Sequence, residues 1–415
     1  MSESLCTTDL LGSKALCMGK VAGKKIVLGI TGSIAAYKAT ELLRHLKKAG
    51  AAVQVAMTAN AAWFVAPLTF ETLSGNRVIE DMFSQDGTSI DHVSLGQESD
   101  LIVIAPATAN FLAKIAHGFG DDFLSTLILA ATAKILICPA MDKEMYVNSV
   151  VQANIHSVKE RGFIVMEPEE GMLATGAIGL GRFPDPSIIM EEIRRILSDH
   201  DFEGVKALIT AGPTIEWIDP VRIVTNRSTG KMGYALARAA WRRGAEVTLV
   251  SGPTHLDPPK GIEVITVTTA EEMREAVLHN SRDKDVVIKA AAVSDYKPLG
   301  KAQQKEKKKG TPITVEMTPT PDILAELGRN KGDITLVGFA AETADHVANA
   351  MEKIQKKNLD LIVVNDVSRE DRGFAADSNE VRMIDRGGNE EAVPLMSKED
   401  VADRILDRIK RLRTG

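Results

Sequence analysis

Apolar and polar residues alternate in blocks along the chain, and the blocks have two different periods. Short runs that are apolar throughout, such as 101–105 (LIVIA), are typical of parallel strands covered on both faces. Longer segments repeat apolar residues every three to four positions, as 33–50 (SIAAYKATELLRHLKKAG) does before its terminal glycine, and these predict amphipathic helices. The regular succession of strand and helix predicts an α/β fold built on doubly wound parallel sheets.

This succession runs through the chain twice. In the first half we expect strands at 24–30, 52–58, 101–108 and 134–141, followed by a Gly/Pro-rich loop and one amphipathic helix. In the second half we expect strands at 205–210, 246–251, 285–292, 335–342 and 359–366, then a hairpin within 380–396 and a helix at 397–413. The pattern predicts a disordered tail at 1–23, one domain at 24–200 and a second domain at 201–415.

Composition and charge exclude several classes of partner. The 415 residues carry a net charge of −6 and only 4% aromatic residues, which argues against nucleic-acid and membrane-surface binding. The apolar runs are far shorter than the ~20 residues that span a membrane. Three cysteines without a CxxC pair give no disulfide framework or zinc signature. We see no targeting segment and expect a cytoplasmic protein that acts on small molecules.

The segment 27–38 (VLGITGSIAAYK) joins a strand to a helix through Gly32 and Ser33. Backbone amides at such a helix start can hold a phosphate group. A tight turn without a ligand is the alternative, because the segment has neither a G-x-G-x-x-G motif nor a Walker lysine. Ligands of open parallel sheets bind beyond the carboxyl ends of the strands. The segments 57–61 (MTANA), 105–110 (APATAN) and 138–146 (CPAMDKEMY) follow the next strands there and offer small residues, hydroxyls and amides.

Together with GSIAAYK, the segments 106–110 (PATAN) and 139–146 (PAMDKEMY) resemble the FMN-binding, cysteine-decarboxylating flavoproteins, which have a flavodoxin-like fold. The resemblance implies FMN at Gly32, Ser33, Thr58, Pro106, Thr108 and Asn110, and a substrate at Met141, Asp142 and Met145. His92, in SIDHVSLG, matches the catalytic base of the family, and a purely structural histidine is the alternative. The implied reaction oxidises a cysteinyl group with FMN as electron acceptor, releases CO₂ and then returns the electrons.

Two residues depart from the pattern of this family. Asp142 stands where the family usually has Asn, and an ionised carboxylate would repel the substrate carboxylate. Either burial keeps Asp142 protonated or the residue has another role. Thr175, in ATGAIGLGR, stands where many members have the cysteine that donates a proton in the second half-reaction. A hydroxyl is a poor acid and could instead order a water, so the sequence leaves the proton donor open.

The segment 211–233 (AGPTIEWIDPVRIVTNRSTGKMG) also joins a strand to a helix, and it is far longer than the 2–6 residues usual for such connections. Gly212, Ser228 and Gly230 can present backbone N–H groups to phosphate oxygens. Asn226 offers an amide suited to a developing oxyanion. The alternative for Asn226 is the N-cap of the following helix.

This segment, together with 291–296 (AAVSDY), 320–324 (TPDIL), 337–343 (VGFAAET) and 356–366 (KKNLDLIVVND), resembles phosphopantothenate–cysteine ligase over 205–366. The whole chain thus resembles the bifunctional bacterial enzymes of coenzyme A synthesis. The resemblance implies that CTP and Mg²⁺ activate 4'-phosphopantothenate as an acyl-cytidylate with release of pyrophosphate. L-cysteine then displaces CMP, and the first half decarboxylates the product. It also implies a homo-oligomer, with trimers of flavin halves and dimers of ligase halves forming a dodecamer.

The same resemblance assigns individual residues of the second half. Asn226 would hold the acyl-cytidylate, and Lys305 would be the catalytic lysine of the lysine-rich segment 300–312, which is either a solvated loop or a mobile lid. Lys353 and Lys357 are four residues apart and share one helix face, which otherwise would simply face solvent. The implied substrate contacts are Gly212, Ser228, Gly230, Lys289, Ala290, Ala291, Asp295, Pro321, Asp322, Ile323, Leu324, Phe339, Lys353 and Lys357.

Three other functions are compatible with parts of this pattern. The first is a flavin decarboxylase of another cysteinyl substrate with an inactive second half, and the second is a non-catalytic flavin-binding regulatory protein. The third, a dinucleotide reductase, is disfavoured because the G-x-G-x-x-G motif is missing. The intact NRSTGKMG segment at 226–233 and the paired lysines favour the bifunctional enzyme.

Overall fold

The computed structural model describes residues 20–82, 92–300, 304, 314–342, 346–366 and 376–414. The chain divides into two compact units, unit 1 (Met1–Ser198) and unit 2 (Asp199–Gly415). Most of the predicted tail lies outside the described residues. Residues 20–23 form a turn, and Val21 is buried in the core, so the ordered chain begins before residue 24.

Unit 1 is built on a five-stranded parallel sheet in the order β2-β1-β3-β4-β5. Every residue of β3 is buried, as expected for a central strand that has helices on both faces. The strands are β1 (Lys25–Ile30), β2 (Ala52–Met57), β3 (Leu101–Ala107), β4 (Lys134–Pro139) and β5 (Ile164–Val165). This order is that of flavodoxin-like folds, which confirms the predicted fold class for the first half.

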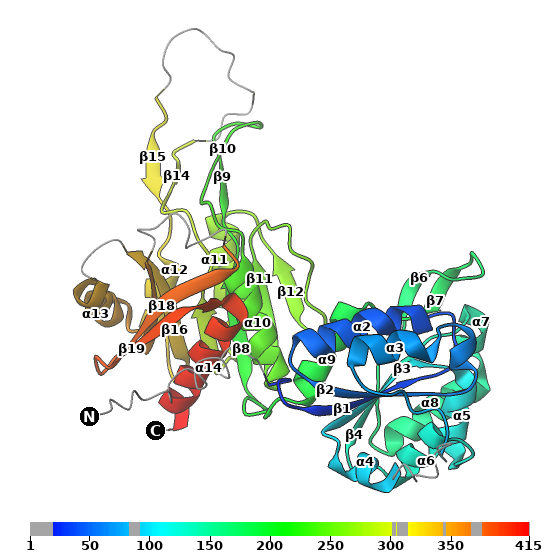
Figure 1. Cartoon of the computed structure of the whole chain (residues 1–415). Helices are drawn as coiled ribbons and strands as arrows, with labels where there is room; N and C mark the ends of the chain where they lie inside the picture. The colour runs from blue at the N-terminus through cyan, green and yellow to red at the C-terminus, as the bar shows by residue number, and fades with distance from the viewer. Residues whose placement is uncertain are drawn as a thin grey trace, which may run out of the picture. The chain divides into compact units, whose positions relative to one another are not determined.

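Two groups of helices cover the faces of this sheet (Figure 1). One face holds α2 (Ala36–Lys48), α3 (Pro67–Ser74) and α9 (Pro186–Ile196); the other holds α4 (His92–Glu98), α5 (Ala109–His117), α6 (Phe123–Ala130) and α8 (Ser149–Glu160). Shorter elements lie at the strand ends: η1 (Ala61–Trp63), α7 (Lys143–Val147) and the hairpin of β6 (Glu169–Met172) and β7 (Ile178–Arg182). Strand β7 covers the start of the predicted Gly/Pro-rich loop, and it differs from a core strand because Ile178 and Leu180 are exposed while the alternating glycines are buried.

Unit 2 is built on an eight-stranded sheet in the order β12-β11-β8-β13-β16-β17-β18-β19. The first six strands are parallel, and the last two form the predicted antiparallel hairpin. They are β8 (Lys206–Ala211), β11 (Glu246–Ser251), β12 (Glu263–Thr266), β13 (Val286–Lys289), β16 (Thr335–Glu342), β17 (Leu361–Asp366), β18 (Ser378–Asp385) and β19 (Glu390–Ser397). The helices α10 (Lys231–Arg242) and α14 (Lys398–Thr414) cover one face, and α11 (Ala270–Asn280), α12 (Ile323–Arg329) and α13 (His346–Lys357) cover the other.

Two antiparallel ribbons project from unit 2 (Figure 1). They are β9 (Ile215–Trp217) with β10 (Ile223–Thr225), and β14 (Tyr296–Pro298) with β15 (Met317–Pro319). The fully buried Asp219 closes the first ribbon, because its Oδ1 accepts hydrogen bonds from the backbone N–H groups of Val221 and Arg222, both at 2.8 Å. Residues 215–225 of the long segment 211–233 therefore form a hairpin.

Candidate functional sites

The carboxyl ends of β1 and β3 in unit 1 are joined by Thr31. Its Oγ1 donates to the carbonyl of Pro106 at 2.8 Å and accepts from the N–H of Thr108 at 2.9 Å. A Cβ on the next residue, Gly32, would lie 2.5 Å from the Cβ of Asn60, so only glycine lets the loops after β1 and β2 approach so closely. The structure thus brings the predicted loop residues of three strands to one edge of the sheet.

Thr58 carries a buried hydroxyl at this edge. Its backbone N–H donates to Ile30 at 3.0 Å, but Oγ1 has no hydrogen-bond partner in the part of the chain that the structure describes. A buried hydroxyl without a partner costs about 1–3 kcal/mol, and a bound ligand would remove this cost. The Thr108 hydroxyl instead caps α5 through the N–H of Phe111, and Asn110 is exposed.

His92 is the half-buried first residue of α4. Beyond the other end of this helix, Asp100 bonds to Lys24 and to the N–H of Lys25, which begins β1. A helix of seven residues is about 10 Å long, and a crossover helix runs antiparallel to its strands. His92 therefore lies at the end of α4 that points toward the carboxyl edge of the sheet, the edge that carries Gly32 and Thr58.

Asp142 and Thr175, the two departures from the family pattern, contact each other. The Oδ2 atom of Asp142 accepts from the Thr175 hydroxyl at 3.1 Å, and Oδ1 accepts from the N–H of Glu144 at 3.0 Å and caps α7. Thr175 lies in the turn between β6 and β7. Two donors therefore point at the carboxyl group of Asp142, which is only half-buried.

The β6–β7 hairpin packs directly on the connection between β4 and α7. The N–H of Met141 donates to Gly181 at 3.0 Å, and a Cβ on Gly181 would lie 2.2 Å from the Met141 carbonyl oxygen. The Met141 side chain is half-buried, and Met145 is exposed on α7. These contacts place the predicted substrate segment next to the turn that carries Thr175.

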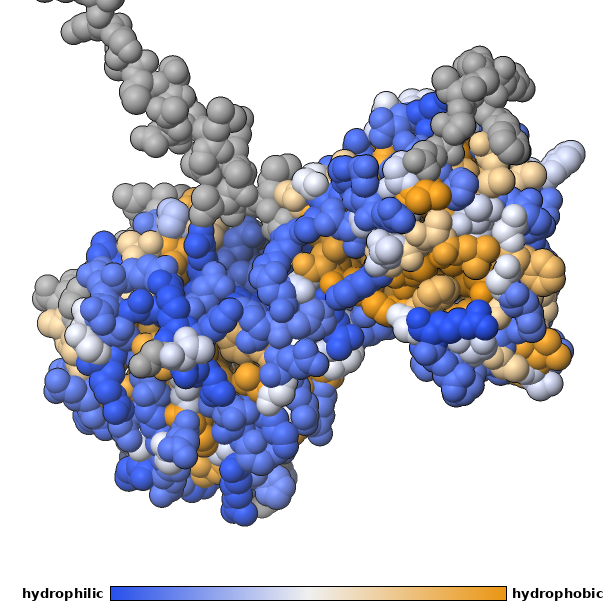
Figure 2. Space-filling view, turned by 90° about the horizontal axis from the view of Figure 1, so that it is seen from below, coloured by the Kyte–Doolittle hydropathy of each residue, from blue (hydrophilic) through white to orange (hydrophobic). Residues whose placement is uncertain are grey.

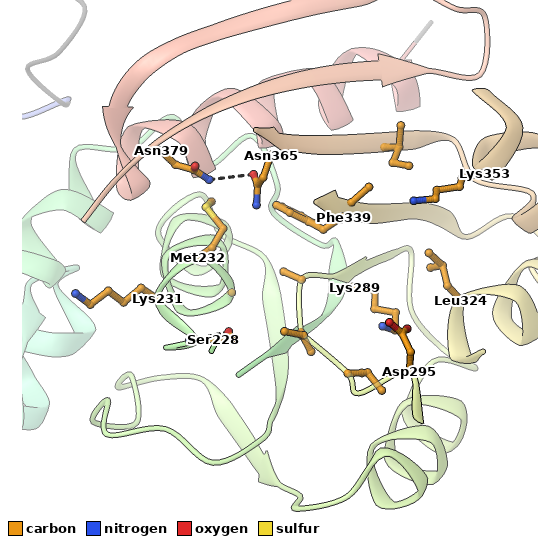
Figure 3. Close-up of a pocket in the computed structure, with 18 of the residues that line it drawn as sticks. Ser228, Lys231, Met232, Lys289, Asp295, Leu324, Phe339, Lys353, Asn365 and Asn379 are labelled. Carbon is orange, nitrogen blue, oxygen red and sulfur yellow. Dashed lines mark hydrogen bonds between the residues drawn. The ribbon is translucent and has the colours of Figure 1, made fainter. Parts of the chain in front are cut away.

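Unit 2 contains a cavity of about 520 Å³ (Figure 3). Its wall comes from the first turn of α10, the segment after β13, the starts of α12 and α14, and the inner face of α13. Most of the predicted substrate contacts line it: Ser228, Gly230, Lys289, Ala290, Ala291, Asp295, Asp322, Leu324, Phe339, Lys353 and Lys357. The fold therefore gathers residues that are far apart in the sequence.

Four other predicted residues of unit 2 lie outside the lining of this cavity. Ile323 is buried in the core, so its side chain supports α12 rather than facing the cavity. Asn226 does not cap α10, whose N-cap is Gly230. The Nδ2 group of Asn226 instead donates to the carbonyls of Ala292 and Val293, both at 3.1 Å. The remaining two are Gly212 and Pro321, and the predicted Lys305 lies outside the described residues.

Positive charge dominates the wall that is formed by α12 and α13. Burial, together with the positive charge of Lys357, lowers the pKa of Lys289 to about 8. Asp322 caps α12 and pairs with Lys357 at 2.8 Å; burial raises the pKa of Asp322, but the hydrogen bond from Lys357 helps to hold it below its usual value. Because Lys353 and Lys357 line the cavity, the alternative that they simply face solvent is wrong.

Comparison with known proteins identifies both halves. The family model described as DNA/pantothenate metabolism flavoprotein C-terminal domain matches residues 202–412, and the Flavoprotein model matches residues 18–198. The Coenzyme A biosynthesis bifunctional protein CoaBC of Bacillus subtilis (strain 168) is 47% identical over 394 residues, which cover 94% of this chain and 97% of that protein. The CoaBC protein of Escherichia coli (strain K12) is 41% identical over 395 residues, with coverages of 94% and 97%. The chain belongs to the CoaBC family.

Solved structures match each half of this CoaBC family member separately. A crystal structure of the C-terminal domain of CoaBC is 42% identical, covers 52% of this chain and 98% of that chain, and has a TM-score of 0.45. A mutant PPC decarboxylase complexed with pantothenoylaminoethenethiol is 28% identical, with coverages of 41% and 97% and a TM-score of 0.37.

Membership of the CoaBC family makes the chain a bifunctional enzyme of coenzyme A biosynthesis, with phosphopantothenoylcysteine decarboxylase and phosphopantothenate–cysteine ligase activities. Unit 1 is the flavoprotein half.

In the described ranges no helix is both long and apolar enough to cross a membrane. Among these residues there is also no group of three or more His, Cys, Asp or Glu side chains placed to hold a metal ion.

The predicted contacts omit several residues that line this cavity, among them Lys231, Met232, Asn365, Asn379 and Lys398. The Nδ2 group of Asn379 donates to the Oδ1 atom of Asn365 at 3.0 Å (Figure 3). Lys398 is buried at the start of α14, where the helix dipole disfavours a cation. That unusual placement of a lysine was the one signal in the sequence that could have drawn attention to Lys398.

Proposed function

We propose that unit 2 joins 4'-phosphopantothenate to L-cysteine with CTP, and that unit 1 then decarboxylates the product with FMN. The single observation that best supports this assignment is the ligase cavity, where basic side chains and the first turn of α10 surround one space. The CoaBC membership of the chain adds the metabolic context.

In the proposed ligation, the carboxylate of 4'-phosphopantothenate attacks the α-phosphate of CTP and releases pyrophosphate. The amine of L-cysteine then attacks the acyl-cytidylate and releases CMP. The positive charges of Lys289, Lys353 and Lys357 would neutralise the phosphates, and Lys305 would act on the transferring group. Asn226 would act as a positioning residue, because both hydrogens of its Nδ2 group bond to the carbonyls of Ala292 and Val293 in the cavity wall.

The residues also fit Mg²⁺ as a companion of the nucleotide. Mg²⁺ in phosphate-transfer sites usually binds one or two carboxylates and takes its other ligands from phosphates and water. Asp295 lines the cavity and could provide such a carboxylate, whereas Asp322 is already paired with Lys357. A site of this kind does not require a preformed cluster of acidic residues.

The residues of unit 1 fit FMN. The buried Thr58 hydroxyl is available to a ligand, and the closeness of Gly32 to Asn60 shapes the turn that would hold the flavin phosphate with Ser33. When bound, FMN supplies a reversible two-electron acceptor. We propose that His92 takes the proton from the cysteinyl group, while the segment from Met141 to Met145 holds the substrate.

We also propose that the chain forms a homo-oligomer, with a dodecamer as its form. Trp63 is 87% exposed and Leu68 is 69% exposed, and they lie close together in the sequence on η1 and α3. The face of unit 1 seen in Figure 2 also gathers hydrophobic side chains. Exposed apolar patches of this kind commonly mark interaction surfaces. Light scattering should give a mass of twelve chains of 44.8 kDa, and a monomer would contradict the proposal.

One assay tests the two proposed reactions together. The protein, reconstituted with FMN, is given 4'-phosphopantothenate, L-cysteine, CTP and Mg²⁺, and both CMP and CO₂ are measured. We expect CMP first and an equal amount of CO₂ after a lag. Release of CO₂ only from added 4'-phosphopantothenoylcysteine would contradict the ligation, and failure to bind FMN would contradict the decarboxylation. Replacing CTP with ATP tests the choice of nucleotide.

A further inference from the structure

A pair of asparagines lines the ligase cavity where strands β17 and β18 lie side by side. Asn365 is near the end of β17 and Asn379 is near the start of β18. The pairing of β18 with β19 is irregular between Asn379 and Val381, and an irregularity of this kind commonly redirects a side chain. Only 3% of Asn379 is exposed, so its amide must find its hydrogen-bond partners within the protein.

The hydrogen bonds of Asn379 fix which end of the Asn365 amide faces the cavity. The Oδ1 atom of Asn379 accepts from the backbone N–H of Glu380 at 3.1 Å, so its Nδ2 group is the end that donates. That group donates to the Oδ1 atom of Asn365 at 3.0 Å. The oxygen of Asn365 is therefore used within the wall, and its Nδ2 group is directed into the cavity (Figure 3). The pair presents a neutral hydrogen-bond donor to whatever the cavity binds.

Two apolar side chains flank this donor. In Figure 3 the Nδ2 group of Asn365 points into the space between Met232 and Phe339, and all three residues line the cavity. Met232 and Phe339 are half-buried and pack on the core. Lys289 and Lys353 lie away from Asn365 in the same view. A neutral donor between apolar groups suits an uncharged oxygen with carbon around it, whereas the phosphates of CTP suit the lysines.

Among the three substrates of the proposed ligation, 4'-phosphopantothenate has the chemistry that fits these groups. L-cysteine has a carboxylate, an ammonium group and a thiol, but no uncharged oxygen. CTP has uncharged oxygens on its base and ribose, but no aliphatic groups to cover Met232 and Phe339. The pantothenate chain carries an amide carbonyl and a hydroxyl close to two methyl groups. Apolar contacts with a few placed polar groups are the usual composition of such a binding site.

We propose that Asn365 binds an uncharged oxygen of 4'-phosphopantothenate, and that Asn379 is a positioning residue that keeps the Asn365 amide turned with its nitrogen toward the substrate. Met232 and Phe339 would cover the two methyl groups of the same chain. The inference rests on the proposed ligation and deepens it, because it gives the second substrate its own part of the cavity.

The test is steady-state CMP release by the full chain, with the KM measured separately for 4'-phosphopantothenate and for CTP. Asn365→Leu keeps a similar volume and removes the donor. The KM for 4'-phosphopantothenate should rise about 3- to 10-fold, as for one neutral hydrogen bond, while the KM for CTP stays unchanged. Asn365→Asp turns an acceptor toward the substrate oxygen, so its rise should be larger, about 10- to 100-fold. Should Asn365→Leu fail to fold, Asn365→Asp still accepts from Asn379 and carries the same test.

A double-variant cycle tests the positioning role of Asn379. Asn379→Asp places a carboxylate against the Oδ1 atom of Asn365, so the Asn365 amide should turn over and present its oxygen to the substrate. The KM for 4'-phosphopantothenate should rise in this variant. In the Asn365→Leu background the same change should cause no further rise, because no amide is left to turn. Additive effects would show that Asn379 acts independently and would overturn its positioning role.

The matched control is Asn389→Ala, in the same β18–β19 hairpin. The Nδ2 group of Asn389 donates to the carboxylate of Asp385 outside this cavity, so the variant should lower the melting temperature and leave both KM values unchanged. The assignment of Asn365 is overturned by an unchanged KM for 4'-phosphopantothenate in Asn365→Leu, by an equal rise in both KM values, or by a rise for CTP alone. Absence of CMP release by the wild-type chain would instead contradict the proposed ligation.

Discussion

Each unit places its site at the carboxyl edge of its own parallel sheet, but the two sites consist of different chemical groups. In unit 1 the edge consists mainly of backbone turns and hydroxyls, with Thr31 joining two strands and Thr58 offering a buried oxygen. In unit 2 the edge carries lysines in a cavity, and burial shifts the pKa of Lys289 and Lys398. Small polar groups suit a planar, largely uncharged ring, whereas buried cations suit polyphosphates. Two parallel sheets of different size and strand order therefore carry chemically different sites at their strand ends.

The comparison implies that each activity can be removed without the other. His92→Gln should lower decarboxylation about 10²- to 10⁴-fold, as expected when a general base is lost, while CMP release stays unchanged. CO₂ release from 4'-phosphopantothenoylcysteine measures the effect. His156→Gln is the control, because His156 is exposed on α8 and pairs with Glu160. Normal decarboxylation by His92→Gln with bound FMN would remove His92 from the mechanism.

The reciprocal prediction is that a substitution in unit 2 removes the ligase activity and leaves the decarboxylase activity intact. Lys289→Met should lower CMP release about 10²- to 10³-fold, as removal of one electrostatic stabiliser does in other enzymes, and leave decarboxylation unchanged. In the wild type, Lys289 is charged below its pKa of about 8, so CTP affinity should fall as the pH rises through this value. The variant should lose part of this pH dependence, and the rest would come from Lys398. Lys284→Met should behave as wild type, because Lys284 is a half-buried lysine that pairs with Asp283 outside the cavity.

The contact between Asp142 and Thr175 provides a further test of unit 1, because it places a negative charge in the site that would bind the substrate carboxylate. Asp142→Asn removes this charge and keeps the side-chain shape, so the KM for 4'-phosphopantothenoylcysteine should fall about 3- to 10-fold, equivalent to one ordinary hydrogen bond. Steady-state CO₂ release measures it, and the ligase KM values serve as the internal control. A rise in KM would show that the carboxylate binds the substrate.

The smallest expected effect concerns two neighbouring threonines. Thr58→Val should lower FMN affinity about 10-fold and leave the melting temperature of the flavin-free protein unchanged, because its buried hydroxyl has no described partner to lose. Thr31→Val breaks two hydrogen bonds between strand ends and should lower that melting temperature. Flavin fluorescence and calorimetry measure the two effects. Equal destabilisation by both variants would mean that the Thr58 hydroxyl serves the fold alone.

The sequence predicted most strands of the two main sheets, though not β5 or β12, and the resemblance to phosphopantothenate–cysteine ligase predicted most of the cavity lining. Buried parallel strands are apolar throughout, and the strand ends carry recognisable motifs at fixed places, as around Lys289 and Phe339. The β9–β10 and β14–β15 ribbons were missed because each strand has only three residues, too few to show a period of two. Their pairing depends on turn closure by groups such as Asp219.

Other features could not be predicted, since they arise from tertiary packing. Lys398 reaches the cavity only because α14 packs against α10 through Glu399. The Asp142–Thr175 bond depends on how the β6–β7 hairpin folds back onto α7, and nothing in either motif alone encodes that contact. Asn226 was read as a helix cap or an oxyanion donor, yet its amide hydrogens are directed at two carbonyl groups of another loop.

The two hydrogen bonds that Asn226 donates limit which side chains this position can accept. An aspartate has the same outline but no N–H group, so it would turn negative oxygens toward the carbonyls of Ala292 and Val293 and push the loops apart. A glutamine keeps the amide but adds a methylene, which would shift both bonds at once. Either substitution would therefore weaken the attachment of the segment 211–233 to the loop after β13.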